Sequence, residues 1–412
     1  MDRLRTVDSR ILSIVIATVA AVSPIAPRAT VPALFILLAY QLVAMARRRA
    51  LPSINIPLAV GFTALVIWSY ISTLWALAPT GGATTRLVPL FVAALCLTAW
   101  AKERGADRQY IGDLCGAFAI AALIYVFEGI SWAWLTRAAH DLTWRDILDG
   151  DTGGIAVMSL LISGTVILSL LMWPVVTGLL MQGRRWCVAV LCVVVAALSV
   201  AFGSESGLIA IILGWLAWWL VSIAGRKAIT AFAVVFVVVV LTTPFIFTRV
   251  LTTETINRIV TEVPHVPNSA LVRLMIWKFT SERIAERPLA GWGFDAARRI
   301  PGGGDKFFLK NAVGQTVTSE LNLPLHPHNQ ILQIWLELGI VGALIVALTG
   351  AALIMQTGKL TPVARNGAIA LITSVLIFDN LSYGAWQSWW IAAVILVAVS
   401  QASMSRLSAR PG

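Results

Sequence analysis

The sequence is poor in charged residues and in cysteine. Asp, Glu, Lys and Arg make up 12% of the 412 residues, about half of the roughly 25% found in an average soluble domain. A soluble fold has no use for 58% hydrophobic residues, so the composition excludes that class and predicts an integral membrane protein. Cys96, Cys115, Cys187 and Cys192 lie within or beside apolar segments. Because they lack a metal-ligand spacing, we interpret them as small buried apolar residues.

Other absences narrow the kind of membrane protein. No internal repeat is evident, so an inverted-repeat transporter receives no support. The basic residues 1–10 run into the first apolar segment without a small-residue cleavage site, so we expect no cleaved signal peptide. The net charge of +11 requires no nucleic acid, because basic inner loops and a phosphate-binding outer face account for it.

Twelve apolar segments approach the roughly 20 residues that a helix needs to cross a bilayer. They predict an all-α fold, a polytopic membrane protein of about 12 transmembrane helices with a long periplasmic helical loop. The expected spans are residues 11–27, 30–46, 56–77, 86–101, 110–135, 153–181, 186–202, 207–224, 228–248, 329–357, 363–383 and 388–405.

The distribution of Lys and Arg predicts the orientation of these spans. Every second connection is basic, and basic short loops mark the cytoplasmic side. We therefore expect both termini in the cytoplasm and residues 249–327 outside. This divides the chain into residues 1–248 with helices 1–9, a periplasmic loop at residues 249–327, called the cap below, and residues 328–412 with helices 10–12.

The cap is too long for a simple connector, which favours a functional role. Residues 270–288, ALVRLMIWKFTSERIAERP, predict an amphipathic helix that ends at Pro288. Arg273, Trp277 and Arg287 lie on or near one face of this helix. The run Gly302-Gly303-Gly304 predicts a mobile stretch between basic residues.

Residues 323–344, LPLHPHNQILQIWLELGIVGAL, contain two of the four histidines beside an apolar segment. His326, Gln330, Gln333 and Glu337 follow one another at spacings of four, three and four, so on a helix they would form one polar stripe. Polar groups that enter a membrane segment usually line a cavity or a substrate path. We interpret this stretch as the floor of an active site.

Three further outer-face features each leave two interpretations. Arg86 is either an interfacial anchor or a contact to a lipid phosphate. Asp149 and Asp151 form a D-x-D pattern that either binds a divalent cation or marks a solvated turn, and we favour the turn. Asp379, inside an apolar segment, is either functional or a structural hydrogen-bond partner.

These motifs resemble the bacterial O-antigen ligase family, which shares a domain with O-antigen polymerases and bacterial O-linked oligosaccharyltransferases. His328-Asn329, nine residues, Gly339, two residues and Gly342 fit the family pattern H-[NSQ]-x9-G-x-x-G. Upstream, residues 272–277 and the run RPLAGWG at 287–293 are similar to a second family pattern, and LWALAP at 74–79 to a weaker third.

One departure concerns a middle span. Relatives often carry an arginine after Ser or Thr near its outer end, where this chain has Ser204-Glu205-Ser206. Either another cation such as Arg86 takes that place, or the matching position lies elsewhere.

The resemblance implies a GT-C type glycosyltransferase of the bacterial inner membrane with a periplasmic active site. The donor would be an undecaprenyl-diphosphate-linked O-polysaccharide and the acceptor a lipid A–core sugar, with membrane lipids around them. It implies no cofactor and no metal. Attack at the anomeric carbon expels a lipid diphosphate in one inverting displacement, and a guanidinium can balance the charge that develops.

The residues suit this chemistry. Arg273 is the candidate for binding the diphosphate, the alternative being an ion pair within the cap. His328 is the candidate base, the alternative being a hydrogen bond at a helix start. His326 is the second candidate base, and Asp379 a group that orients a histidine. The candidates for substrate binding are Arg86, Asn329, Trp277, Glu205 and Arg287.

Two other classes remain as alternatives. A transporter of lipid-linked glycans would need ionisable residues near the bilayer midplane, but no Lys or Arg is expected there and the acids gather outward. A binding or scaffold protein would not need a histidine and an arginine that converge on one cavity. Within the resembling superfamily, O-antigen polymerase and O-linked oligosaccharyltransferase remain alternatives to ligase.

Overall fold

The computed structural model describes residues 2–49, 53–77, 81–140, 153–263, 265–311 and 313–404. Asp149 and Asp151 lie outside this part of the chain, and with them the D-x-D hypothesis. The helices of the bundle are α1 (Asp2–Val22), α2 (Thr30–Arg48), α3 (Ile56–Ser72), α4 (Gly81–Arg104), α5 (Arg108–Ile130), α6 (Trp134–Ala139), α8 (Gly153–Met181), α9 (Arg185–Ala201), α10 (Glu205–Ala224), α11 (Arg226–Val250), α14 (Gln330–Thr357), α15 (Pro362–Leu381) and α16 (Ser388–Met404).

The predicted all-α, polytopic fold is confirmed, since each of the twelve expected spans corresponds to a helix. Within the described residues, nine helices are long and apolar enough to cross a membrane, and α9 and α16 are shorter apolar helices. The segment expected at 11–27 is the apolar half of α1, which ends at Val22. The first nine residues of α1, DRLRTVDSR, contain five charged residues, so only its second half suits a bilayer core.

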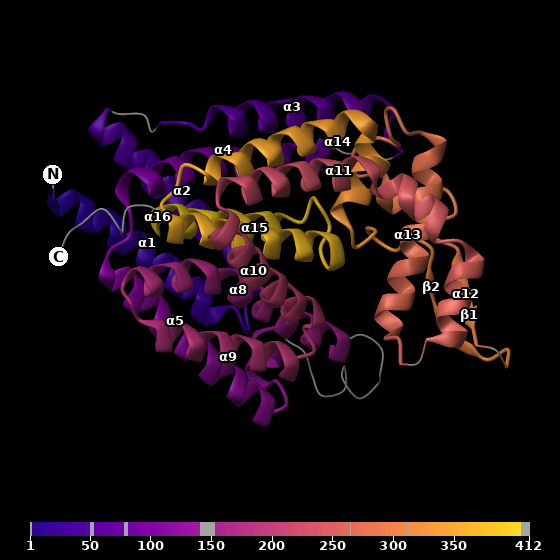
Figure 1. Ribbon diagram of the computed structural model, residues 1–412, viewed down its shortest axis with the longest axis horizontal. Helices are drawn as coiled ribbons and strands as arrows, with labels where there is room; N and C mark the ends of the chain where they lie inside the picture. The colour runs from indigo at the N-terminus through magenta and orange to yellow at the C-terminus, as the bar shows by residue number, and fades with distance from the viewer. Residues whose placement is uncertain are drawn as a thin grey trace.

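α8 lies at the centre of the bundle, where residues 163–179 are buried without interruption. A helix that is apolar all round is expected to be enclosed by others, and α5, α9, α15 and α16 pack against it. Trp173 in α8 donates a hydrogen bond to Ser374 of α15, at 2.8 Å, which satisfies its indole N–H inside the core. Figure 1 shows the long helices running side by side, with the start of α1 and the end of α16 at one end and the cap at the other.

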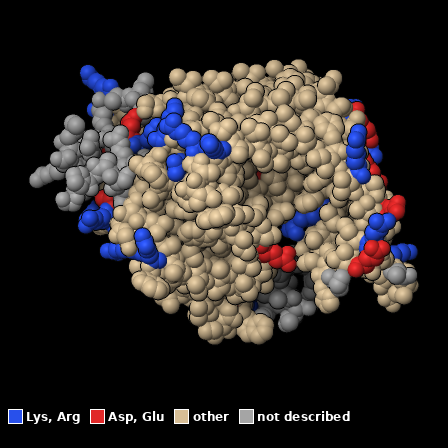
Figure 2. Space-filling model, in the orientation of Figure 1, with Lys and Arg blue, Asp and Glu red and all other residues tan. Residues whose placement is uncertain are grey.

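The surface of the bundle is what helices in contact with lipid require. Figure 2 shows Lys, Arg, Asp and Glu gathered toward the two ends of the molecule, with a broad uncharged surface between them on this face. Exposed large apolar side chains such as Ile56, Leu123 and Val193 lie on these helices. The same view shows a recess between the bundle and the cap that contains basic atoms.

The cap contains a small core of its own. Leu251, Ile256, Leu271, Phe307 and Leu309 are buried together. Its elements are α12 (Thr253–Glu262), α13 (Asn268–Glu286), the short η3 (Ala296–Arg299) and the strands β1 (Lys306–Lys310) and β2 (Thr316–Leu321). The amphipathic helix expected over residues 270–288 is thus found as α13.

The hairpin was not predicted, and the Gly302–Gly304 run is an ordered turn rather than the expected mobile stretch. β1 and β2 pair antiparallel, with Phe308 opposite Ser319. The turn before them is bonded on both sides, because Gly303 N–H donates to Ile300 O at 2.9 Å and Leu323 N–H donates to Gly303 O at 3.0 Å. Burial alternates along KFFLK as in a strand with one covered face, but its three central residues are all apolar, so the sequence itself shows no alternation at this point.

A break in α14 attaches the cap to the bundle. Gly339 has φ 64° and ψ −161°, a backbone region open essentially only to glycine. This break frees backbone carbonyls in the preceding turn. Leu336 O accepts from Trp292 N–H at 2.8 Å, Glu337 O accepts from Gly293 N–H at 2.9 Å, and Leu338 O accepts from the Trp68 indole at 2.9 Å.

The glycines of the sequence motifs meet at this break. A Cβ on Gly339 would lie 2.3 Å from Leu289 O, and a Cβ on Gly291 would lie 2.5 Å from Glu337 O. A Cβ on Gly293 would lie 2.4 Å from the Cα of Ala76, within the LWALAP run. The segment 287–293 therefore contacts both of the other motif segments closely, and side chains at these glycines would push the segments apart.

Candidate active site

His328 lies in the turn before α14 and has φ 51°, a left-handed conformation that is uncommon for a residue with a side chain. Its Nδ1 lies 2.8 Å from the carbonyl oxygen of Ser382. A carbonyl only accepts, so Nδ1 carries the proton and donates it. In the neutral ring this places the lone pair on Nε2, which has no hydrogen-bond partner among the described residues. This is the tautomer that a general base requires.

His326 is held on both sides. Its Nδ1 accepts the backbone N–H of His328 at 3.2 Å, so in the neutral ring Nε2 carries the proton. The amide of Gln387 lies 3.2 Å from that Nε2, while Gln387 Oε1 is buried without a partner among the described residues. Exchanging the amide O and N of Gln387 gives the His326 Nε2–H an acceptor and puts the amide nitrogen at the position without a partner. A Cβ on Gly384 would lie 2.9 Å from the His326 ring, so the glycine makes room for it.

Both imidazoles are neutral near pH 7. Burial, together with the smaller effects of the nearby His328 and Arg298, lowers the pKa of His326 to about 3. Burial also lowers the pKa of His328; the hydrogen bond to Ser382 raises it, and the charge of Arg273 lowers it. The ring centroids lie 4.3 Å apart. Because His326 already uses both nitrogens, the geometry distinguishes the two, with His328 as the available base and His326 as its support.

Arg273 of α13 lies near enough to His328 for its charge to affect the pKa of that histidine. Its guanidinium makes one long contact, 3.4 Å to Ser269 O, and among the described residues no carboxylate forms an ion pair with it. Burial lowers the pKa of Arg273, while Glu205 of α10 raises it. An arginine stays charged despite such a shift. A half-buried cation is therefore present near His328 without a bonded anion in the described part of the chain.

A second basic group lies near His326. Arg298 in η3 is 3.7 Å from Asp295. Burial raises the pKa of Asp295, and Arg298 and Arg86 lower it. The cap thus brings Arg298 near His326 and α4 brings Arg86 near Asp295. Arg298 was not among the sequence candidates, because its place in the chain, next to a glycine-rich run, gives no sign that it faces a histidine 28 residues away.

The remaining candidates surround the site in different roles. Trp277 donates from its indole to Pro327 O at 3.0 Å, so α13 supports the segment between the two histidines. Asn329 caps α14 by accepting the N–H of Leu332 at 3.0 Å. Arg287 stacks over the ring of Trp292 at 4.1 Å, a cation–π contact within the cap. Asp379 accepts the indole N–H of Trp390 at 2.8 Å; the group that orients His328 is the Ser382 carbonyl.

The first turn of α10 reaches the same place. Ser206 and Ser382 are 3.1 Å apart at their hydroxyl oxygens. The turn that carries Glu205 therefore contacts the residue whose carbonyl holds His328.

The expected stripe of polar residues is partly formed, since α14 begins at Gln330 and His326 lies before it. Gln333 donates to Glu337 Oε1 at 3.0 Å and accepts the N–H of Ala385 at 2.9 Å. Glu337 Oε2 accepts the Trp386 indole at 2.6 Å and the backbone N–H of Asp295 at 2.8 Å. Glu337 therefore joins α14, the cap and the turn at residues 382–387. Sequence reasoning missed this turn, whose small and aromatic residues carry no recognisable motif.

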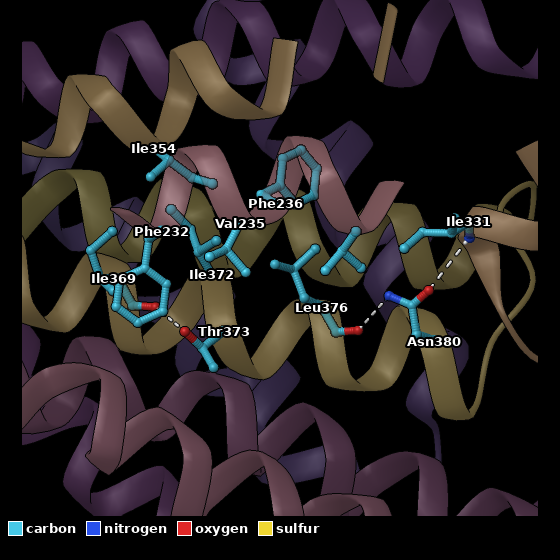
Figure 3. A pocket seen from close by; sticks show the side chains of 11 residues that line it. Phe232, Val235, Phe236, Ile331, Ile354, Ile369, Ile372, Thr373, Leu376 and Asn380 are labelled. Atoms are coloured by element: carbon cyan, nitrogen blue, oxygen red, sulfur yellow. Dashed lines mark hydrogen bonds between the residues drawn. The ribbon is translucent and has the colours of Figure 1, made fainter. Parts of the chain in front are cut away.

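An apolar cavity of about 190 Å³ lies beside the site, between α11, α14 and α15. Figure 3 shows Phe232, Ile369 and Ile372 at one end and Asn380 with Ile331 at the other. Asn380 accepts the N–H of Ile331 at 3.4 Å and donates to Leu376 O at 2.8 Å. Because Ile331 is three residues from His328, the cavity ends close to the candidate base.

A membrane bundle with a cap, a neutral hydrogen-bonded histidine and a half-buried arginine beside it is the kind of site that a membrane enzyme contains. Comparison with known proteins points to the same class. Residues 191–347 match the family described as O-Antigen ligase. The predicted resemblance to the O-antigen ligase family is thereby confirmed, and the matched residues include α13 and the histidine motif.

Relatives with similar sequences carry names of the same kind. A "Putative polysaccharide ligase" of Rickettsia felis is 26% identical over 81% of this chain and 77% of its own length. Proteins of the same description from Rickettsia conorii and Rickettsia prowazekii are 35% and 38% identical, over 32% of this chain and 31% of their own lengths. No solved structure matches the chain. These findings support a polysaccharide ligase activity in general.

Proposed function

We propose that the protein is an O-antigen ligase that transfers O-polysaccharide from undecaprenyl diphosphate to a sugar of lipid A–core, as a GT-C type enzyme with its site at the periplasmic face of the inner membrane. The observation that carries the proposal is the arrangement of His328, with its Nε2 lone pair available, beside the partly exposed guanidinium of Arg273. The names of the relatives and the description of the matching family support O-antigen ligase activity rather than O-antigen polymerase activity.

In the proposed reaction the acceptor hydroxyl oxygen attacks the anomeric carbon of the donor sugar. Its proton passes to His328 Nε2, and the bond between that carbon and the diphosphate oxygen breaks. The electron pair leaves with the lipid diphosphate, whose negative charge Arg273 balances. One displacement inverts the anomeric centre. The chain's own groups then supply both the base and the charge compensation, so no metal or cofactor is part of the proposal.

The apolar cavity between α11, α14 and α15 supports a lipid-linked donor. Its described lining is hydrocarbon apart from Thr373 and Asn380, and it ends near Ile331. A prenyl chain there would remain in an apolar environment while the diphosphate reached Arg273 outside the bundle. A transporter would need no base of fixed tautomer at this position, so the hydrogen bond between His328 and Ser382 favours an enzyme.

The test compares His328→Ala and Arg273→Lys in purified, monodisperse protein with donor glycolipid and lipid A–core. His328→Ala is expected to lower turnover by about 10²–10⁴-fold, the usual worth of a general base, while donor binding is kept. Arg273→Lys keeps the charge but loses the planar fork, so it should impair both donor binding and turnover.

Matched controls use the same residue types elsewhere in the cap. His265→Ala changes an exposed histidine, and Arg258→Lys changes an exposed arginine paired with Glu254; both should transfer glycan at the unmodified rate. If folded His328→Ala also transfers glycan at the unmodified rate while His326→Ala does not, the base is His326 and the assignment to His328 is wrong. If neither histidine matters, the proposed base chemistry is wrong.

A further inference from the structure

The cap hairpin has one face that contributes nothing to the cap core. In β1, Phe307 and Leu309 point inward to Ile256 and Leu271, while Lys306, Phe308 and Lys310 point outward. The cross-strand partners on the outward face are Leu321, Ser319 and Thr316. Figure 1 shows the hairpin on the far side of α13 from the bundle, beyond the ends of the long helices.

This outward face combines an aromatic ring with two cations. The side chain of Phe308 is 59% exposed, although burying a phenyl group is worth roughly 1.5–3 kcal/mol. Lys306 and Lys310 are exposed on either side of it, about 13 Å apart at 3.3 Å per strand residue. Neither lysine forms an ion pair within the described residues, and none of the six residues on this face is acidic. Glu320 pairs with Phe307 and so belongs to the other face.

These groups suit a ligand that is ring-shaped, rich in hydroxyls and anionic. The flat ring of Phe308 can stack on the apolar face of a sugar ring, the hydroxyl of Ser319 can bond to a sugar hydroxyl, and the ammonium groups can contact phosphates or carboxylates. The distance between the lysines exceeds a single sugar ring. A membrane surface fits less well, because the hairpin lies away from the spanning helices.

The hairpin is continuous with the candidate base. β2 ends at Leu321, and the chain reaches His328 seven residues later through Asn322, whose amide donates to Gly302 O at 3.0 Å. A glycan of several sugars bound along the hairpin would have to extend over this segment to reach the group that receives the acceptor proton.

We propose that the outward face formed by Lys306, Phe308, Lys310 and Ser319 binds the phosphorylated core oligosaccharide of the acceptor and directs its reactive sugar toward His328. This inference rests on the proposed ligase function. It assigns to the hairpin the recognition of the acceptor, whereas Arg273 serves the donor.

The experiment measures initial rates of the full-length protein in nanodiscs at varied acceptor and varied donor. The acceptor is a lipid A–core glycolipid from a strain without O-polysaccharide, used in its native form and after phosphatase treatment. The variants are Lys306→Gln with Lys310→Gln, and Phe308→Ser. The controls are Glu320→Gln on the opposite face of the hairpin and Lys359→Gln at the other end of the bundle.

The double lysine variant should raise the KM for native acceptor roughly three- to thirtyfold, the effect of losing two exposed charge contacts. It should do so with kcat and donor KM unchanged, and the effect should disappear with the dephosphorylated acceptor. Phe308→Ser should raise the KM for both acceptor forms. The two controls should change none of these values.

Unchanged acceptor KM values in both variants would overturn the inference while leaving the ligase function standing. A rise in donor KM instead would also overturn it, because the face would then serve the donor glycan. If the unmodified protein transfers no glycan to either acceptor form, the proposed function itself fails; direct binding of the soluble core oligosaccharide to the variants still decides the inference about the hairpin.

Discussion

Replacing Glu337 measures how strongly the cap is tied to the bundle. Its carboxylate is completely buried and accepts three N–H groups, from Gln333, the Trp386 indole and the backbone of Asp295. Glu337→Leu removes all three acceptors at once. An unsatisfied buried donor costs about 1–3 kcal/mol, so the substitution should destabilise the protein by roughly 3–9 kcal/mol, less whatever water can restore.

Glu337→Gln separates these contributions. Its amide oxygen can take the place of Oε2 and keep the bonds from Trp386 and Asp295. Its amide nitrogen then faces the Gln333 N–H donor, and Gln333 cannot turn its oxygen inward without losing the bond from Ala385. One hydrogen bond is lost either way, which predicts a cost of about 1–3 kcal/mol.

Thermal unfolding in detergent, followed by size-exclusion chromatography, gives the ranking of the variants. The apparent Tm should fall in the order unmodified, Glu337→Gln, Glu337→Leu. Glu262→Leu, on the exposed side of α12, is the control and should melt like the unmodified protein. If Glu337→Leu melts as high as the control, the three hydrogen bonds do not hold the cap, and the account of the cap attachment is wrong.

Four other expectations follow from the site. Since burial and Arg273 lower the pKa of His328, kcat/KM should stay high at pH values below 6.5, the ordinary pKa of a histidine. Arg273→Gln should raise the pKa of His328, so kcat/KM should begin to fall at a higher pH. An unchanged pH profile would contradict the electrostatic effect of Arg273 on His328. The stabilisation from this neutral imidazole is present above pH 6.5 and lost as pH falls through the lowered pKa. Gly339→Ala should lower the Tm, because φ 64° costs a side chain about 1–3 kcal/mol before the contact with Leu289 O is counted, whereas Gly116→Ala, which points into open space, should not. Transfer should survive EDTA; loss of turnover that Mg²⁺ restores would favour a metal instead. Cysteine labelling of Arg299→Cys, an exposed position in the cap, from outside intact cells should succeed, and labelling only from the cytoplasm would remove the case for periplasmic chemistry.

Local pattern was sufficient to predict much of the fold. Long apolar runs correspond to helices because a bilayer permits few other ways to satisfy the backbone. The start of α14 follows from Asn329, which caps the helix through a contact only three residues along the chain. The helix of the cap was predicted by its periodicity, while the hairpin was not, since β1 and β2 are short and their pairing depends on a turn that includes Asn311 and Gly314.

The position of the protons on the two histidines depends on contacts between residues far apart in the sequence, which a short sequence motif cannot predict. The motif identifies His328, but the proton position on its ring is set by Ser382, 54 residues away. In the same way, Gln387 fixes His326 from 61 residues away. The sequence offered Asp379 either as a group that orients a histidine or as a structural hydrogen-bond partner. In the fold its carboxylate accepts from Trp390, and His328 donates to the backbone carbonyl of Ser382. Every residue has a backbone carbonyl that can accept a hydrogen bond from a histidine, so the sequence contains no motif that predicts this contact.

The glycine motifs acquire a physical meaning once the break in α14 is known. An uninterrupted helix would use the carbonyls of Leu336, Glu337 and Leu338 internally, and the cap would have no backbone groups to bond. The break at Gly339 exposes them at the level where Glu337 also reaches Asp295 and Trp386. The same few residues thus fix the cap that carries Arg273 and the turn that orients His328. A substitution at these residues is expected to impair both donor binding by Arg273 and proton acceptance by His328. His328→Ala differs from it, because that variant should still bind the donor.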